Sequence, residues 1–145
     1  MTRIFAYLRL HHRTRQALGF AQKKALEEIK KINAVQKIAD KAMQHAISII
    51  KNSKIKSPFL YHDNNKLTSE FLKQEIQDIF NSNGLESPEG IIVSSENQTA
   101  MPHDTGSGPI KANSPIILDI FPRSTKTRYF CDMTRTVCKG SPSAK

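Results

Sequence analysis

The sequence contains few cysteines, and their positions exclude a disulfide framework. Cys131 and Cys138 are the two cysteines among the 145 residues, and neither belongs to a Cys-x-x-Cys pair. Isolated thiols of this kind are typical of a protein that keeps them reduced. Because neighbours along a strand point to opposite faces, we expect Cys131 to point away from the side of Asp132. It is predicted to be a packed thiol and not a metal ligand.

Long apolar runs are also missing. None approaches the roughly 18 residues that a membrane-spanning helix needs, and the apolar stretch at residues 4–8 is too short for a signal-peptide core. Hydrophobic residues make up 38% of the chain and charged residues 24%, as in ordinary globular domains. We therefore expect a cytoplasmic protein of one domain that has no membrane partner.

Acidic residues are scarce at both ends of the chain. Residues 1–24 carry six basic and no acidic residues, and residues 121–145 carry six basic and one acidic, whereas the middle has ten basic and twelve acidic. The net charge of +9 is therefore concentrated at the ends. This distribution favours weak, non-specific nucleic-acid binding through the basic ends over a continuous phosphate-binding face.

Two stretches have the periodicity of amphipathic helices. Apolar residues recur every three or four positions from residue 21 to residue 50. A second helix is predicted to begin at Thr68 or Ser69, which can act as its cap, and to stop at Gly84. Its predicted buried face consists of five apolar residues: Phe71, Leu72, Ile76, Ile79 and Phe80.

The remaining segments define the domain organisation. Residues 52–66 are polar and contain Pro58, so they are predicted to form a loop. We divide the chain into a basic, poorly ordered lead-in at residues 1–20, one domain at residues 21–140, and a tail at residues 141–145.

Two carboxylates interrupt β-prone segments in the last third of the chain. Asp119 lies in the apolar run 116–121, and Asp132 lies between two short β-prone stretches. The turn-prone segment 122–127 allows the strands to pair as an antiparallel hairpin with both carboxylates on one face. A carboxylate in a buried strand needs a positive partner. The sequence leaves two partners open: a shared metal ion, or an arginine such as Arg135.

A polar loop precedes these strands. Residues 91–94 form the first predicted strand, and residues 95–108 follow as a loop rich in Ser, Asn and Gly. This loop carries His103 shortly before two glycines. Loops of this length are frequently functional.

The segment from His103 to Gly140 resembles the pita-bread metallopeptidases, the family of methionine aminopeptidase, Xaa-Pro aminopeptidase and prolidase. The shared features are a Pro-His pair before a glycine-rich turn, an aspartate in a strand, and a second aspartate in an Asp-x-Thr-Arg-Thr strand: His103, Asp119 and Asp132. The Thr-Arg-Thr ending is most similar to the Xaa-Pro branch. The resemblance implies an α+β fold, the first half of a pita-bread fold, with two amphipathic helices packed on a curved antiparallel sheet.

The resemblance also implies a site with two divalent metal ions, which could be manganese, cobalt, iron or zinc. Asp119 would chelate one ion, Asp132 would bridge both, and His103 would donate a hydrogen bond to the substrate or the tetrahedral intermediate. The reaction would be hydrolysis of an N-terminal peptide bond of the Xaa-Pro type. The expected partner is a peptide substrate, and a homodimer stays open.

The chain departs from the family pattern in three ways. The complete site needs a histidine and two glutamates beyond the Thr-Arg-Thr strand. We therefore expect a partial domain with little or no activity. Whether this partial domain binds metal by itself stays open. Asp119 and Asp132 are 13 positions apart, which is longer than the usual spacing in the family. Because the difference is an even number of residues, the two side chains keep the same faces of their strands. Phe121 and Arg128 stand where glycine is frequent in the family, which alters the substrate pocket.

The alternative function is a non-catalytic binding module for peptide or RNA.

Overall fold

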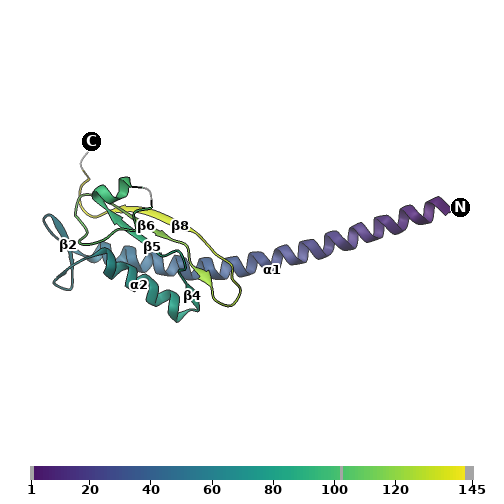
Figure 1. Ribbon diagram of the computed structural model, residues 1–145, viewed down its shortest axis with the longest axis horizontal. Helices are drawn as coiled ribbons and strands as arrows, with labels where there is room; N and C mark the ends of the chain where they lie inside the picture. Colours follow the sequence, from purple (N-terminus) through teal and green to yellow (C-terminus); the bar gives the residue numbers. More distant parts are fainter. Residues whose placement is uncertain (1, 102, 143–145) are drawn as a thin grey trace.

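The computed structural model describes the backbone of residues 2–101 and 103–142, and the side chains among them from residue 22 onwards. Two helices pack against an antiparallel sheet, and a small meander lies at one end of the molecule (Figure 1). The elements are α1 (Thr2–Asn52), β1 (Lys54–Lys56), β2 (Phe59–His62), β3 (Asn65–Lys66), α2 (Ser69–Ser82), β4 (Leu85–Glu86), β5 (Ile91–Ser95), η1 (Glu96–Ala100), β6 (Pro115–Ile120), β7 (Arg123–Ser124) and β8 (Met133–Cys138). The predicted α+β class is confirmed. Within the described residues, no helix is both long and apolar enough to span a bilayer.

Helix α1 is longer than predicted. It begins at Thr2, not near residue 21, and passes without a break through the proposed boundary at residue 20. Its first half projects beyond the sheet (Figure 1), and its buried side chains begin at Val35. Buried alanines spaced three or four residues apart let α2 approach closely: Ala39, Ala42 and Ala46. The division into lead-in, domain and tail stays a prediction.

The segment 52–66, predicted to be a loop, is a three-stranded antiparallel meander in the order β1-β2-β3. Its second turn is made by Asp63 and Asn64, which have φ angles of 46° and 66° and are residue types that tolerate the left-handed region. Leu60 in β2 is fully buried and fixes the meander to the core. Strands of two to four residues are too short for their periodicity to be read from sequence.

Helix α2 confirms the predicted cap and stop. The Thr68 side chain accepts a hydrogen bond of 3.2 Å from the backbone N–H of Phe71, and Gly84 follows the helix with a φ of 68°. The buried face contains Leu72, Ile76 and Phe80, all fully buried. Phe71 was predicted to belong to this face, but this residue is 38% exposed. Its ring packs instead against the ring of His62 in β2, with 5.6 Å between the ring centres.

The main sheet has the order β5-β6-β8, and all its pairs are antiparallel. Along β6, residues alternate between buried and more exposed, with Ile116, Leu118 and Ile120 fully buried against the helices. The intervening residues face the other side, which no described element covers to the same degree. The connection between β6 and β8 is extended by β7, which pairs with β4. The predicted hairpin pairing of the two aspartate segments is therefore confirmed.

Candidate metal site

Asp119 lies on the outer face of the sheet and not in the core. It is half-buried and lies between Ile92 of β5 and Thr134 of β8 in the strand register. The Thr134 hydroxyl donates a hydrogen bond of 2.6 Å to Asp119 Oδ1. The expectation of a carboxylate enclosed in a buried strand was wrong, because the helices cover only the face that Leu118 and Ile120 occupy.

Asp132 immediately precedes β8 and is exposed. It lies two residues before Thr134, and alternate residues of a strand share a face. Because Thr134 is directly opposite Asp119, strand parity assigns both aspartates to the same side of the sheet. A common side is one of the conditions for a shared ion.

The arginine alternative was wrong. Arg135 lies opposite Leu118 in the register, so it has the other parity from Asp119. Its Nη1 donates instead to the carbonyl of Thr134 at 2.7 Å. Among the ion pairs of the described residues, none joins Asp119 to an arginine.

His103 lies in an exposed loop that is fastened to the free edge of β5. His103 itself is exposed and has a φ of 65°. Two residues later, the carbonyl of Thr105 accepts a hydrogen bond of 3.0 Å from Val93 N–H. Val93 is the neighbour of Ile92, which pairs with Asp119. The order across the sheet is therefore the His103 loop, β5, the Asp119 strand and the Asp132 strand, and the histidine loop lies about two strand spacings, roughly 10 Å, from β6.

Two α2 side chains hold this loop, and sequence reasoning missed both roles. Lys73 Nζ donates to the carbonyl of Gly106 at 2.7 Å, and Glu70 Oε1 accepts from Gly108 N–H at 2.8 Å. The hydrogen bond from Gly108 is the main cause that lowers the pKa of the Glu70 carboxyl below its usual value. The only signal in the sequence was that Glu70 suited the first turn of a helix, which did not indicate a partner so far along the chain.

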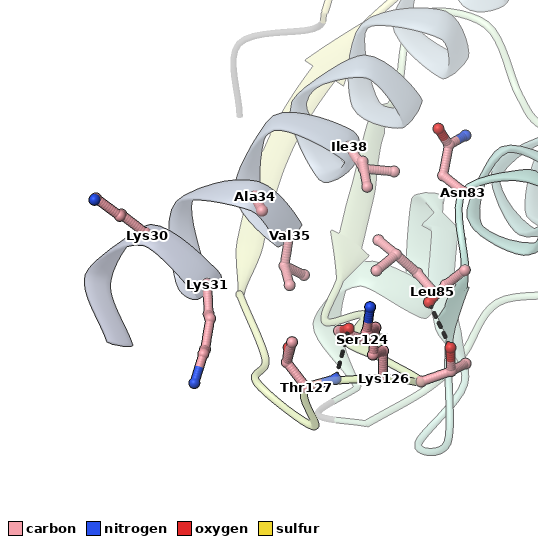
Figure 2. Close-up of a pocket in the computed structure, with 12 residues that line it drawn as sticks. Lys30, Lys31, Ala34, Val35, Ile38, Asn83, Leu85, Ser124, Lys126 and Thr127 are labelled. Atoms are coloured by element: carbon pink, nitrogen blue, oxygen red, sulfur yellow. Dashed lines mark hydrogen bonds between the residues drawn. The ribbon is translucent and has the colours of Figure 1, made fainter. Parts of the chain in front are cut away.

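The described residues supply two ligands and not a complete cluster. No group of three or more His, Cys, Asp or Glu side chains in the part of the chain that the structure describes could hold a metal ion. A cavity of about 570 Å³ lies elsewhere, between α1 and the segment around β7 (Figure 2). It is lined by apolar side chains such as Val35 and Leu85 and by lysines, and it has no carboxylate. This cavity therefore cannot be the metal site.

Arg128, which stands where glycine is frequent in the family, keeps the backbone conformation of a glycine. It adopts a φ of 64°, a left-handed conformation that favours glycine. Its Nη1 lies 2.8 Å from Glu86 Oε1, and Arg123 Nη2 lies 2.7 Å from the same oxygen. These contacts connect the hairpin to β4.

The cysteines differ in accessibility, which gives a direct test of the burial of Cys131. Cys131 is 7% exposed, and burial, with the nearby charges of Asp40 and Asp132, raises the pKa of its thiol to about 11. Cys138 is exposed. We expect one thiol per native chain to react with Ellman's reagent at pH 8, because a thiol with so high a pKa stays protonated. Both should react in denaturant. Rapid reaction of both thiols in the native protein would contradict the buried position of Cys131.

Comparisons with known proteins agree with this geometry. Residues 30–145 match the model of metallopeptidase family M24. The prolidase of Pyrococcus furiosus is 26% identical with a TM-score of 0.64, and the match covers 81% of this chain and 31% of that one. The Xaa-Pro dipeptidase of Bacillus anthracis is 26% identical with a TM-score of 0.62, over 81% and 29% of the two chains.

A third structure, the X-Pro aminopeptidase of Thermotoga maritima MSB8, shares the fold at 22% identity and a TM-score of 0.56, over 81% of this chain and 30% of that one. The search of curated proteins gave no match. The chain thus spans about a third of the length of the solved structures it matches.

Proposed function

Because this chain belongs to metallopeptidase family M24, we propose that it carries the first part of a dinuclear metal site that hydrolyses an N-terminal peptide bond of the Xaa-Pro type. Asp119 and Asp132 are the metal ligands of the proposal, and His103 is its substrate-binding residue. The observation that carries it is the shared side of Asp119, in β6, and Asp132, which directly precedes the paired strand β8. A binding surface without metal would not need this arrangement.

The two carboxylates are suited to be part of the ligand set of a pair of divalent cations. Carboxylate oxygens suit hard and borderline metal ions, and the hydrogen bond from Thr134 fixes the orientation of the Asp119 carboxylate, as residues around metal ligands commonly do. Two such ions, when bound, lower the pKa of a shared water and stabilise negative charge on the scissile carbonyl. The aspartates would hold the cations on the open face of the sheet, where a peptide can approach.

His103 has a separate role in the proposal. Its loop is docked on β5 through the carbonyl of Thr105 and on α2 through the carbonyl of Gly106, so the backbone that carries His103 is held near the sheet edge. From there it donates a hydrogen bond to the substrate or to the oxyanion that develops on it. A donor held in place before the reaction loses little free energy to reorganisation, which is the physical benefit of the fastened loop.

Two protein ligands are too few for a stable dinuclear centre. The match covers only 31% and 29% of two similar solved structures, and we propose that the remaining ligands come from a region equivalent to the unmatched part of those structures. The chain by itself should therefore have little or no activity on Xaa-Pro peptides. Metal-dependent turnover that disappears in Asp119→Ala would show that further ligands are not needed.

Metal binding tests the ligand assignment without activity. We expect the chain to bind Mn²⁺ weakly, roughly in the millimolar range, as measured from the free-ion electron paramagnetic resonance signal. Asp119→Asn and Asp132→Asn should each weaken binding about tenfold or more, because each removes a charged ligand. Asp78→Asn is the matched control, since Asp78 is an exposed carboxylate on α2. Equal effects at positions 119 and 78 would refute the assignment.

A non-catalytic binding module is the second candidate. It is favoured by the exposure of Asp132 and by the absence, among the described residues, of a third ligand near the aspartates. This candidate predicts no difference in Mn²⁺ binding between the native chain and either aspartate variant. The same titration therefore separates the two functions.

A further inference from the structure

The meander presents aromatic rings and lysines in register on one face. Lys54 of β1 lies directly opposite Tyr61 of β2, and Tyr61 lies directly opposite Lys66 of β3. In the next row, Lys56 lies opposite Phe59. Directly paired residues share a face of an antiparallel sheet, and so do residues two apart along a strand. All five side chains therefore belong to one surface, which we call the lysine–aromatic face.

This surface points outward. The other side of β2 carries Leu60, which is fully buried, whereas Phe59 and Tyr61 are half-buried and the three lysines are exposed. Lys56 Nζ lies 4.7 Å from the centre of the Tyr61 ring, and Lys66 Nζ lies 4.8 Å from that of Phe59. One face of each ring is thus covered by a lysine ammonium group and not by the core.

The face also borders a hollow and carries little negative charge. A depression of about 300 Å³ lies against Lys54, Lys56 and Tyr61. Asp63, at its rim, contributes the one carboxylate among the residues that line it. A fourth lysine, Lys111, bridges to Phe59 through its backbone but is paired with Glu96. The accessible surface beside the rings is therefore basic.

We propose that the lysine–aromatic face binds single-stranded nucleic acid, with bases stacked on Tyr61 and Phe59 and phosphates bound by Lys54, Lys56 and Lys66. The two rings are two residues apart on one strand, about 7 Å. Successive bases in a duplex are about 3.4 Å apart. A flexible single strand can open to match the wider spacing of the rings, whereas a duplex cannot offer its base faces at all.

A base can replace the lysine that now lies over each ring. An exposed ammonium–ring contact changes an equilibrium by only a few-fold, whereas stacking of one base on an aromatic side chain is worth about five- to a hundred-fold or more in affinity. The displaced ammonium then lies within reach of the phosphate that accompanies the base. An acidic peptide would satisfy the lysines but would leave the rings unused, so the aromatic rows favour nucleic acid. This inference does not depend on the proposed peptidase activity, because it uses none of the residues of that site.

Binding of a short oligonucleotide tests the proposal on the whole chain. The sequence has no tryptophan, so Tyr61→Trp places a single fluorescent indole on the face. We expect its emission to be quenched, with saturation, by oligouridylate and oligothymidylate of about ten nucleotides. The two oligonucleotides distinguish RNA from DNA as the preferred strand. The matching duplex and polyglutamate should quench much less, and equal binding of polyglutamate would show a general polyanion site and overturn the proposal.

Variants separate stacking from charge. Tyr61→Leu and Phe59→Leu should each weaken binding about tenfold, while Tyr61→Phe keeps the ring and should keep the affinity within about twofold. The double change Lys54→Gln/Lys56→Gln should lower the slope of log affinity against log salt by about 1.4, the value for two contacts to a single strand. The matched control, Lys23→Gln/Lys24→Gln on exposed positions of α1, removes the same charge. An equal loss in that control, or no loss in the leucine variants, would overturn the proposal. Circular dichroism of each variant establishes that it is folded.

Discussion

Replacement of Gly106 by alanine should unfold or severely destabilise the chain, by about 3–5 kcal/mol. A Cβ at this position would lie 1.8 Å from the carbonyl oxygen of Val93 and 2.7 Å from the Cα of Ser94. Both are backbone atoms of β5, which cannot move without disturbing its pairing with β6. Gly106 also has a φ of 78°, which an L-residue adopts at a cost of roughly 1–2 kcal/mol. The steric overlap is therefore the larger part of the effect.

Gly108→Ala is the matched control for that experiment. Gly108 has a φ of 72°, but no atom lies within 4 Å of where its Cβ would be. Its N–H can still donate to Glu70. Urea unfolding should show a loss of only about 1–2 kcal/mol, from the backbone conformation alone.

Hydrogen exchange gives a local measurement for the same pair of variants. The amide of Val93 donates to Thr105 and should lose protection in Gly106→Ala but keep it in Gly108→Ala. Equal destabilisation by the two alanines would mean that the loop does not lie against β5. In that case the position assigned to His103 would also be wrong.

Helix α2, the part of α1 from residue 21 onwards and the main sheet could be predicted because their signals are local. Thr68 and Gly84 mark the two ends of α2 through caps that involve neighbours in sequence. The strand around Asp119 is a run of apolar residues long enough to identify by composition. The meander could not be predicted, because its strands are very short and its stability comes from Leu60, which reaches a core assembled from distant residues.

The support of the His103 loop could not be predicted for a different reason. Lys73 and Glu70 reach glycines more than thirty positions later, and nothing in the sequence near either partner indicates the contact. Both partners use backbone groups of the loop, so the side chains of the loop carry no sign of them. The family resemblance supplied the candidate residues of the proposed site, while the contacts that hold the His103 loop emerged only from the structure.

The environment of Asp119 was predicted wrongly because composition does not distinguish a strand that is buried on one face from a strand that is buried on both faces. The run 116–121 has apolar residues at nearly every position, which is typical of a strand covered on both sides. In the structure, Leu118 is fully buried while Asp119 is half-buried, so the helices cover one side only. The location of the carboxylate on the other side is what makes it available to a metal ion.

Exchange of the residue types at these two neighbouring positions tests that conclusion directly. Leu118→Asp should leave the chain largely unfolded, because it removes a fully buried leucine, worth about 2–5 kcal/mol, and places an unpaired carboxylate in the core at a further cost of several kcal/mol. The total is comparable with the whole stability of a typical domain, about 5–15 kcal/mol. Asp119→Leu makes the opposite change one residue later, on the open face, and loses only the hydrogen bond from Thr134.

We expect Asp119→Leu to change the free energy of unfolding by no more than about 1 kcal/mol, since a partly exposed hydrogen bond contributes little on balance. Circular dichroism and urea titration of the two variants measure the difference. If Leu118→Asp folded normally while Asp119→Leu did not, the sheet would have to be turned over, with the aspartates inside. Metal ions could then reach them only through the core, and the shared open face on which the peptidase proposal depends would not exist.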